Sequence, residues 1–168
     1  MNKKIIFPAG NPTRSLLPYE TNPRQRILVV EDHYAVRRFS SELLKDSGYE
    51  VEAAEDGEVA WDTLQRNDCD LLITENKMPK LSGVELLRKI FAARMTLPVI
   101  MVSETLPMDE LKEQPWLHIE AMLFKSYAVE EFLATVRNVL ANNCGAYDEV
   151  ARPPIRQSQS SAAGLQVW

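Results

Sequence analysis

The chain has 168 residues, 45% of them hydrophobic, so it can bury a sizeable core as one domain with flanking segments. Its formal net charge of −5 argues against a general binder of nucleic acid or of membrane surfaces, because such binders need a basic face. No apolar run approaches a membrane span, and the apolar start of the chain is too short for a signal peptide, so we expect a cytoplasmic protein.

The cysteine and histidine content argues against a disulfide or a zinc site. Cys69 and Cys144 lie far apart in the sequence, and no Cys or His has the spacing of zinc ligands. We therefore expect reduced thiols.

Both ends of the chain differ in composition from its centre. Residues 1–24 contain four prolines and no sustained helical or strand period, which predicts a flexible N-terminal arm. Residues 143–168 contain a Pro-Pro pair and a Ser/Gln/Ala run, which predicts a flexible tail and no attached DNA-reading module. We expect the folded domain to be residues 25–142.

Strand and helix patterns alternate five times between these ends. Apolar runs predict strands at 26–30, 70–74, 98–103 and 120–124, and a further strand is expected at 50–54. Helical spacing predicts helices at about 33–47, 57–67 and 83–93, a short one after Pro107 that Pro115 limits, and one from Ser126 to about 140. The residues expected to face inward in the first three helices are Val36, Phe39, Leu43, Leu44, Val59, Ala60, Leu64, Val84, Leu87, Ile90 and Phe91. The alternation predicts a three-layer α/β fold, a parallel sheet with helices on both faces.

Local signals mark some helix ends. Ser82 and Glu85 have the spacing of a capping box. Gly48 can take the positive φ that closes a helix. Ser126 is the expected N-cap of the last helix.

Polar residues follow four of the predicted strands. They are Glu31 and Asp32 after the first strand, Glu75 after the third, Ser103 at the end of the fourth and Lys125 after the fifth. The carboxyl ends of strands in an open α/β sheet form the crevice in which ligands bind. We therefore expect these five side chains to gather at one edge of the sheet.

This set resembles the receiver domain of two-component response regulators over residues 26–142. The turn from Met78-Pro79 to Gly83 and the stretch from Gly48 to Ala60 support the resemblance. It implies a flavodoxin-like (βα)5 sheet with strand order 2-1-3-4-5. It further implies that Glu31 and Asp32 help to hold Mg²⁺, that residue 75 is the phosphoacceptor, and that Ser103 and Lys125 contact the phosphate.

Three positions depart from the family pattern. The acceptor position carries Glu75, whose carboxylate lies about 1.5 Å further from the backbone than that of aspartate, and a misplacement of about 1 Å can cost about a hundredfold in rate. The switch position carries Met122 in place of an aromatic residue. Ser126 follows Lys125 in place of proline, which predicts a trans peptide bond there. We expect Glu75 to reach toward Lys125 and Ser103.

The sequence leaves other interpretations of these residues open. Glu31 and Asp32 could cap the following helix, although their register with Glu75 and Lys125 favours a pocket. Ser103 is equally well a turn cap. Whether Glu31, Asp32 and Glu75 together bind Mg²⁺ stays open, because Mg²⁺ requires near-octahedral geometry. We expect Met122 to lie in the core.

We therefore expect a stand-alone atypical receiver in two-component or phosphorelay signalling that is not an enzyme. It would bind a histidine kinase or a downstream effector, or a second copy of itself, through the face of the fourth helix, fifth strand and fifth helix. Its phosphoacceptor chemistry would be lost, or mimicked by Glu75. The alternative is a working receiver that takes phosphate from a histidine kinase, with Asp32 as the other acceptor. A nucleotide- or flavin-binding enzyme is weakly supported, because the loop at Glu31 has no glycines.

Overall fold

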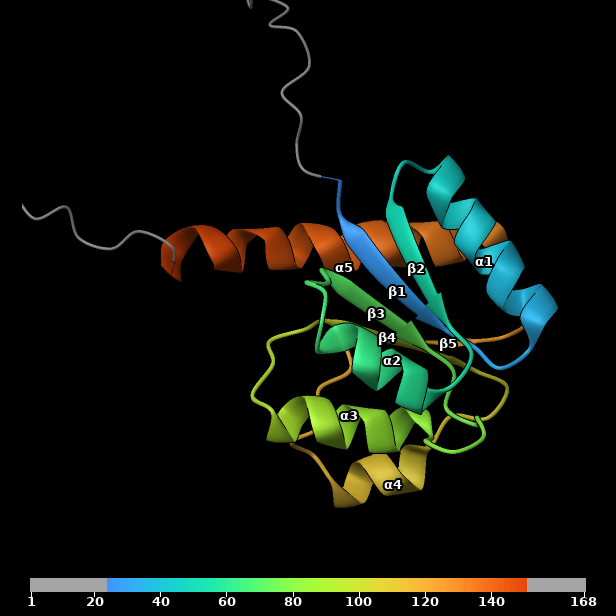
Figure 1. Ribbon diagram of the computed structural model, residues 1–168, viewed down its shortest axis with the longest axis vertical. Helices are drawn as coiled ribbons and strands as arrows, with labels where there is room; N and C mark the ends of the chain where they lie inside the picture. Colours follow the sequence, from blue (N-terminus) through green and yellow to red (C-terminus); the bar gives the residue numbers. More distant parts are fainter. Residues whose placement is uncertain (1–23, 151–168) are drawn as a thin grey trace, which may run out of the picture.

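Five parallel strands form one sheet in the order β2-β1-β3-β4-β5 (Figure 1). The computed structural model describes residues 24–150, with side chains described as far as Asn143. The strands are β1 (Arg26–Val30), β2 (Glu50–Ala54), β3 (Leu71–Thr74), β4 (Val99–Ser103) and β5 (Ala121–Phe124). This is the predicted flavodoxin-like order. The predicted N-terminal arm and most of the predicted tail lie outside the described residues.

The helices cover both faces of the sheet and complete the three predicted layers. They are α1 (Tyr34–Asp46), α2 (Gly57–Leu64), α3 (Gly83–Ala92), α4 (Met108–Glu113) and α5 (Val129–Val150). Figure 1 shows α2, α3 and α4 on one side and the long α5 on the other, together with α1. No helix within residues 24–150 has both the length and the apolar character needed to cross a bilayer.

Alternation along the strands divides the core into two layers. In β1, Leu28 and Val30 point to the side covered by α2 and α3, whereas Ile27 and Val29 point to the side covered by α1 and α5. Both faces of the central strands are buried, which explains why these strands are continuous apolar runs.

Three residues that were predicted to face the core are exposed, so these predictions are wrong. Phe39 of α1 is 54% exposed, Phe91 of α3 is 55% exposed and Val59 of α2 is 38% exposed. In α1 the buried positions are Ser40, Ser41 and Leu44, so the inner stripe is rotated away from Phe39. Small serines let α1 approach the sheet closely, and hydrophobic spacing alone does not reveal such a stripe.

The helix-end predictions are confirmed in two cases and wrong in one. Gly48 has a φ of 96°, and Ser82 forms a complete capping box with Glu85. Ser126 lies in a turn, because α5 begins three residues later at Val129. Every peptide bond between residues 24 and 150 is trans, which confirms the prediction for Lys125–Ser126.

The last two helices differ in length from their neighbours. Pro107 precedes α4 and Pro115 follows it closely, which confines α4 to Met108–Glu113. In contrast, α5 continues to Val150, beyond residue 142, where we expected the domain to end. The side-chain amide of Asn143 donates to the Val139 carbonyl at 2.9 Å, so this residue, which we took as the start of the tail, belongs to the helix.

Candidate functional site

The register of the sheet places two acidic strand ends side by side. Val30, the last residue of β1, pairs with Thr74, the last residue of β3. Glu31 and Glu75 are therefore neighbours, and the Glu75 N–H donates to the Val30 carbonyl at 2.9 Å. Only 5% of Glu31 and 4% of Glu75 is exposed. Two buried carboxylates so close together need compensating donors or cations.

The neighbouring strands supply those partners. Ser103 ends β4 and pairs with Phe124, so Lys125 follows β5 beside it. The Lys125 N–H donates to the Ser103 carbonyl at 3.2 Å. We call the resulting group, Glu31, Asp32, Glu75, Ser103 and Lys125, the acidic pocket.

Donors surround the Glu75 carboxylate. Its Oε1 accepts the Ser103 hydroxyl at 2.5 Å and the backbone N–H groups of Asn76 at 2.7 Å and Lys77 at 3.0 Å. Its Oε2 lies 2.7 Å from the Lys125 ammonium. The expectation that Glu75 reaches Lys125 and Ser103 is confirmed. Hydrogen bonds to a charged acceptor are roughly twice as strong as neutral ones, so this arrangement fixes the side chain firmly.

The Lys125 ammonium bridges the two buried glutamates. Its Nζ lies 3.0 Å from both oxygens of Glu31, in addition to the contact with Glu75. The Lys125 side chain is 19% exposed. A lysine ammonium has three donors, and here three carboxylate oxygens accept them.

Burial and charge act in opposite directions on these groups. Burial raises the pKa of Glu75, but Lys125, Ser103 and the two backbone N–H groups outweigh it and hold the pKa below its ordinary value. Burial dominates at Glu31 and raises its pKa despite Lys125. For Lys125, burial lowers the pKa, but contacts with Glu75 and Glu31 reverse this and raise it. The pocket thus favours an ionised Glu75 and a charged Lys125.

Two predicted site residues lie apart from this network. Asp32 is exposed, and within the described residues no donor is hydrogen-bonded to its carboxylate. Of the two acids, Glu31 alone caps the turn, accepting the His33 N–H at 3.2 Å. Met122 is 38% exposed, so the expectation that it lies in the core is wrong. It shares a sheet face with Met101, but the short α4 leaves it uncovered.

Hydrogen bonds between Asn76 and the start of α3 hold the loop between β3 and α3 in place. The carbonyl and side-chain oxygens of Asn76 accept the N–H groups of Gly83 at 2.9 Å and Val84 at 3.1 Å. A Cβ on Gly83 would collide with the carbonyl oxygen of Glu75, so only glycine fits there. The backbone that presents Glu75 is therefore rigid.

Sequence reasoning missed two residues that support the pocket. The Arg37 guanidinium donates to the carbonyls of Glu31 at 2.6 Å and Asp32 at 3.1 Å. Tyr127 lines a small hollow together with Glu31 and Glu75; its ring stacks on Phe132, with ring centroids 5.2 Å apart, and burial raises its pKa. The only signal for Arg37 is its position one turn beyond the acidic loop, and Tyr127 lies only two residues from Lys125.

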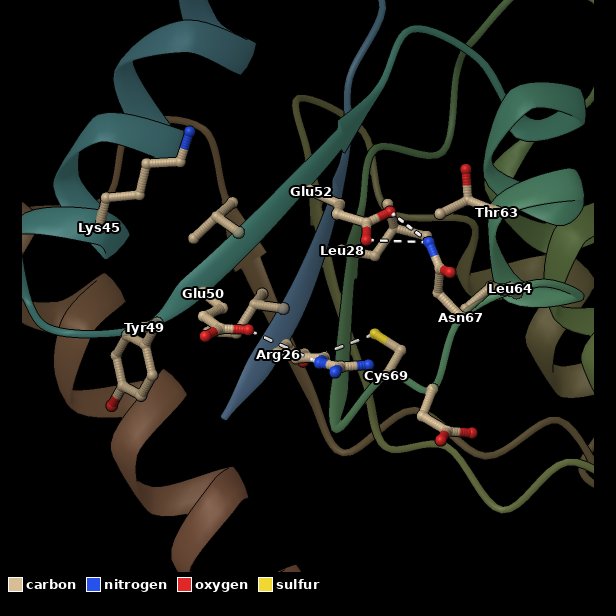
Figure 2. Close-up of a pocket in the computed structure, with 13 residues that line it drawn as sticks. Arg26, Leu28, Lys45, Tyr49, Glu50, Glu52, Thr63, Leu64, Asn67 and Cys69 are labelled. Carbon is tan, nitrogen blue, oxygen red and sulfur yellow. Dashed lines mark hydrogen bonds and ion pairs between the residues drawn. The ribbon is translucent and has the colours of Figure 1, made fainter. Parts of the chain in front are cut away.

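Two hollows in the surface are candidate ligand sites. One of about 370 Å³ opens on the acidic pocket and is lined also by Lys77 and Glu104. A second, of about 500 Å³, lies at the amino ends of the strands (Figure 2). Two of its three acids are already partnered, since Glu50 pairs with Arg26 at 3.6 Å and Glu52 accepts the Asn67 amide. The first hollow is the candidate site because it adjoins the acidic pocket at the carboxyl ends of the strands, where ligands bind in open α/β sheets.

Comparisons with known proteins show the family to which this fold belongs. Residues 27–137, well over half of the chain, match the family model of the response regulator receiver domain. The chain belongs to this family, whose members are signalling modules of two-component systems and not classical enzymes. Receiver domains interact with kinases or effectors, and they typically bind Mg²⁺.

Individual relatives show the same likeness. The response regulator MprA of Mycobacterium sp. (strain KMS) is 34% identical over 115 residues, which cover 68% of this chain and 50% of that protein. The chain thus spans about half the length of the curated relatives it matches. The structure of the Vibrio cholerae chemotaxis protein CheY4 is 27% identical, with a TM-score of 0.63 over 69% of this chain and 98% of that one. A CheY-like receiver domain from Methanospirillum hungatei JF-1 shares the fold, with a TM-score of 0.69 and 24% identity over 73% of this chain and 98% of that one.

The carboxylates of the pocket do not fit a divalent metal as they are arranged. Across the part of the chain with described side chains, no three acidic, histidine or cysteine residues are grouped as metal ligands. Lys125 lies between Glu31 and Glu75, and Asp32 stands apart. In this structure the cation that lies between the two buried carboxylates is Lys125.

Proposed function

We propose that this chain is a receiver module that signals by binding a protein partner, with Glu75 mimicking a phosphorylated acceptor. The observation that carries the proposal is the pair of contacts that Ser103 and Lys125 make with the Glu75 carboxylate, at 2.5 and 2.7 Å. The resemblance assigns phosphate contact to these two residues. An anionic oxygen of Glu75 thus takes the donors that a phosphoryl group would take.

The same contacts disfavour phosphoryl transfer to Glu75. An attacking carboxylate must turn one oxygen toward the phosphorus in line with the leaving group. Both Glu75 oxygens accept hydrogen bonds or an ion pair, and the longer side chain moves them away from the position of an aspartate carboxylate. Permanent charge replaces reversible phosphorylation in this proposal.

The proposed docking surface is the face formed by α4, β5 and α5. β5 is an edge strand, and its Met122 and Phe124 are 38% and 56% exposed on the same side. Met108 of α4 is 46% exposed. Exposed apolar side chains at an edge strand suit a protein partner, which we take to be a histidine kinase or a downstream effector.

Substitution at Glu75 tests the proposal. The partner, once isolated with the full chain and purified, is titrated against the parent protein and against Glu75→Gln and Glu75→Asp by calorimetry. We expect both variants to bind at least about tenfold more weakly, a loss of about 1.4 kcal/mol. Glu75→Gln removes the negative charge, and Glu75→Asp shortens the side chain that contacts Ser103 and Lys125. Equal affinity of Glu75→Gln and the parent would show that the charge at residue 75 is irrelevant and would exclude mimicry. Glu42→Gln, which changes an exposed glutamate of α1, is the control.

A further inference from the structure

We propose that the acidic pocket is neutralised by the chain's own cations, Lys125 and Arg37, and does not bind Mg²⁺. This separates the chain from receiver domains that use the metal. It goes beyond the proposed function, because it concerns which cation the pocket holds and not which partner the module binds.

The oxygens of the two buried carboxylates already have hydrogen-bond or ion-pair partners. Glu31 Oε1 accepts the His33 N–H and contacts Lys125, and Oε2 contacts Lys125. Glu75 Oε1 accepts three hydrogen bonds and Oε2 contacts Lys125. Mg²⁺ needs oxygen ligands at about 2.0–2.1 Å in near-octahedral geometry. It would have to displace these donors to reach either residue.

Lys125 is held at both its side chain and its backbone. All three ammonium hydrogens have carboxylate acceptors, and the backbone N–H is bonded to the Ser103 carbonyl. With 19% of its side chain exposed, Lys125 has little access to water as an alternative partner. Moving the ammonium out would leave two buried carboxylates without a cation, which is strongly unfavourable.

Arg37 binds the backbone oxygens of the loop that carries Glu31 and Asp32. Its guanidinium donates to the carbonyls of Glu31 and Asp32 at 2.6 and 3.1 Å. Its charge also lies over the Tyr34 ring, 5.7 Å from the centroid. Carbonyl oxygens are hard ligands of the kind Mg²⁺ uses, and a neighbouring guanidinium repels a second cation.

The other carboxylates that line this hollow, those of Asp32 and Glu104, are exposed. Exposed carboxylates that are not grouped with further ligands do not make a site for an ion that gives up its water reluctantly. The conformation of the pocket is therefore independent of Mg²⁺, and removing Lys125 should leave the carboxylates of Glu31 and Glu75 free to take a divalent cation.

Thermal unfolding with and without Mg²⁺ tests this on the full chain, with no partner or phosphodonor present. We expect no change in the Tm of the parent. In Lys125→Met the Tm should rise by about 5–10 °C at a Mg²⁺ concentration about a hundred times the Kd. Lys125→Arg keeps the charge and should show no rise. Lys112→Met, which removes a lysine 71% exposed on α4, is the matched control. Lys125→Gln keeps a donor toward the carboxylates and replaces Lys125→Met if that variant does not fold.

Mn²⁺ serves as a paramagnetic probe of the same site, and its free concentration is measured by electron paramagnetic resonance. A Mg²⁺-induced rise in the parent's Tm, or stoichiometric Mn²⁺ binding to the parent, would overturn the proposal. No response in the neutral Lys125 variant would overturn it too, because Lys125 would then not be what excludes the metal. No partner is present in these experiments, so their outcome does not depend on whether Glu75 mimics a phosphorylated acceptor.

Discussion

The Ser103 hydroxyl lies 2.5 Å from the Oε1 of Glu75, and both side chains are buried. The two residues come from adjacent strands and are 28 positions apart in the sequence. A neutral hydroxyl that donates to a buried carboxylate lowers the cost of keeping the charge away from water. The contact therefore links the ends of β3 and β4 through the charge of Glu75.

Ser103→Ala should lower the free energy of unfolding by about 1–3 kcal/mol, because a buried charged acceptor loses a donor. Urea denaturation at neutral pH measures the change. Ser47→Ala is the control. The Ser47 hydroxyl also donates a hydrogen bond, but its acceptor is the neutral carbonyl of Leu43 and the residue is exposed. Similar losses in the two variants would contradict the special position of Ser103.

The pH dependence of stability should reveal the ionised state of Glu75. Its folded pKa lies below its unfolded value, so the unfolded chain takes up the proton first as the pH falls. The stability that Glu75 contributes is therefore present above the unfolded glutamate pKa of about 4.3 and is lost as the pH falls through the folded pKa.

Glu75→Gln removes this titration. The difference in unfolding free energy between the parent and Glu75→Gln should be largest near neutral pH and should shrink in acid. Glu31, whose pKa is raised, acts with the opposite sign, but it is present in both proteins. A difference that stays constant from neutral to acid pH would mean that Glu75 is not held ionised.

Asp56 should stabilise the protein more through its cap at the start of α2 than through its ion pair with Lys80. It is 2% exposed, its carboxylate accepts the N–H groups of Glu58 and Val59, and it pairs with Lys80 at 2.5 Å. Asp56→Ala should cost about 1–2 kcal/mol or more through the lost cap. Lys80→Ala should cost clearly less, because Lys80 is half exposed and water screens its charge. Equal costs in chemical denaturation would contradict this division.

The exposed apolar residues of β5 should contribute to binding and not to folding. The double variant Met122→Ala and Phe124→Ala should leave the Tm nearly unchanged and weaken partner binding at least about tenfold. Phe39→Ala, at a site 54% exposed on α1, is the matched control. If Phe39→Ala weakens binding and the β5 variant does not, the docking face is on α1. A dimer that the β5 changes dissociate would identify the partner as a second copy of the chain.

Much of the fold follows from the sequence because few arrangements are possible for parallel strands joined by helices. Apolar runs located β1, β3, β4 and β5, β2 was placed between two predicted helices, and the alternation with helices predicted the three layers. The meeting of Glu31, Glu75, Ser103 and Lys125 follows from the same rule, since each comes at or just after the end of a strand. What the sequence could not show is that Lys125 divides its donors between two glutamates.

The residues that were misjudged depend on how each helix is rotated against the sheet. Phe39 is apolar but exposed, while Ser40 is polar but buried, because α1 packs closely through small side chains. Arg37 reaches the loop carbonyls through its long side chain, and no periodic pattern predicts such a contact. Met122 faces the helical layer, but α4 is too short to cover it.

The central claim is that the charge of Glu75 replaces phosphorylation. The direct measurement is the intact mass of the purified chain after incubation with acetyl phosphate and Mg²⁺, followed by digestion to locate any adduct. We predict an unchanged mass, because both Glu75 oxygens are engaged by Ser103, Lys125 and backbone N–H groups. A stable gain of one phosphoryl group, on Glu75 or on Asp32, would contradict the account.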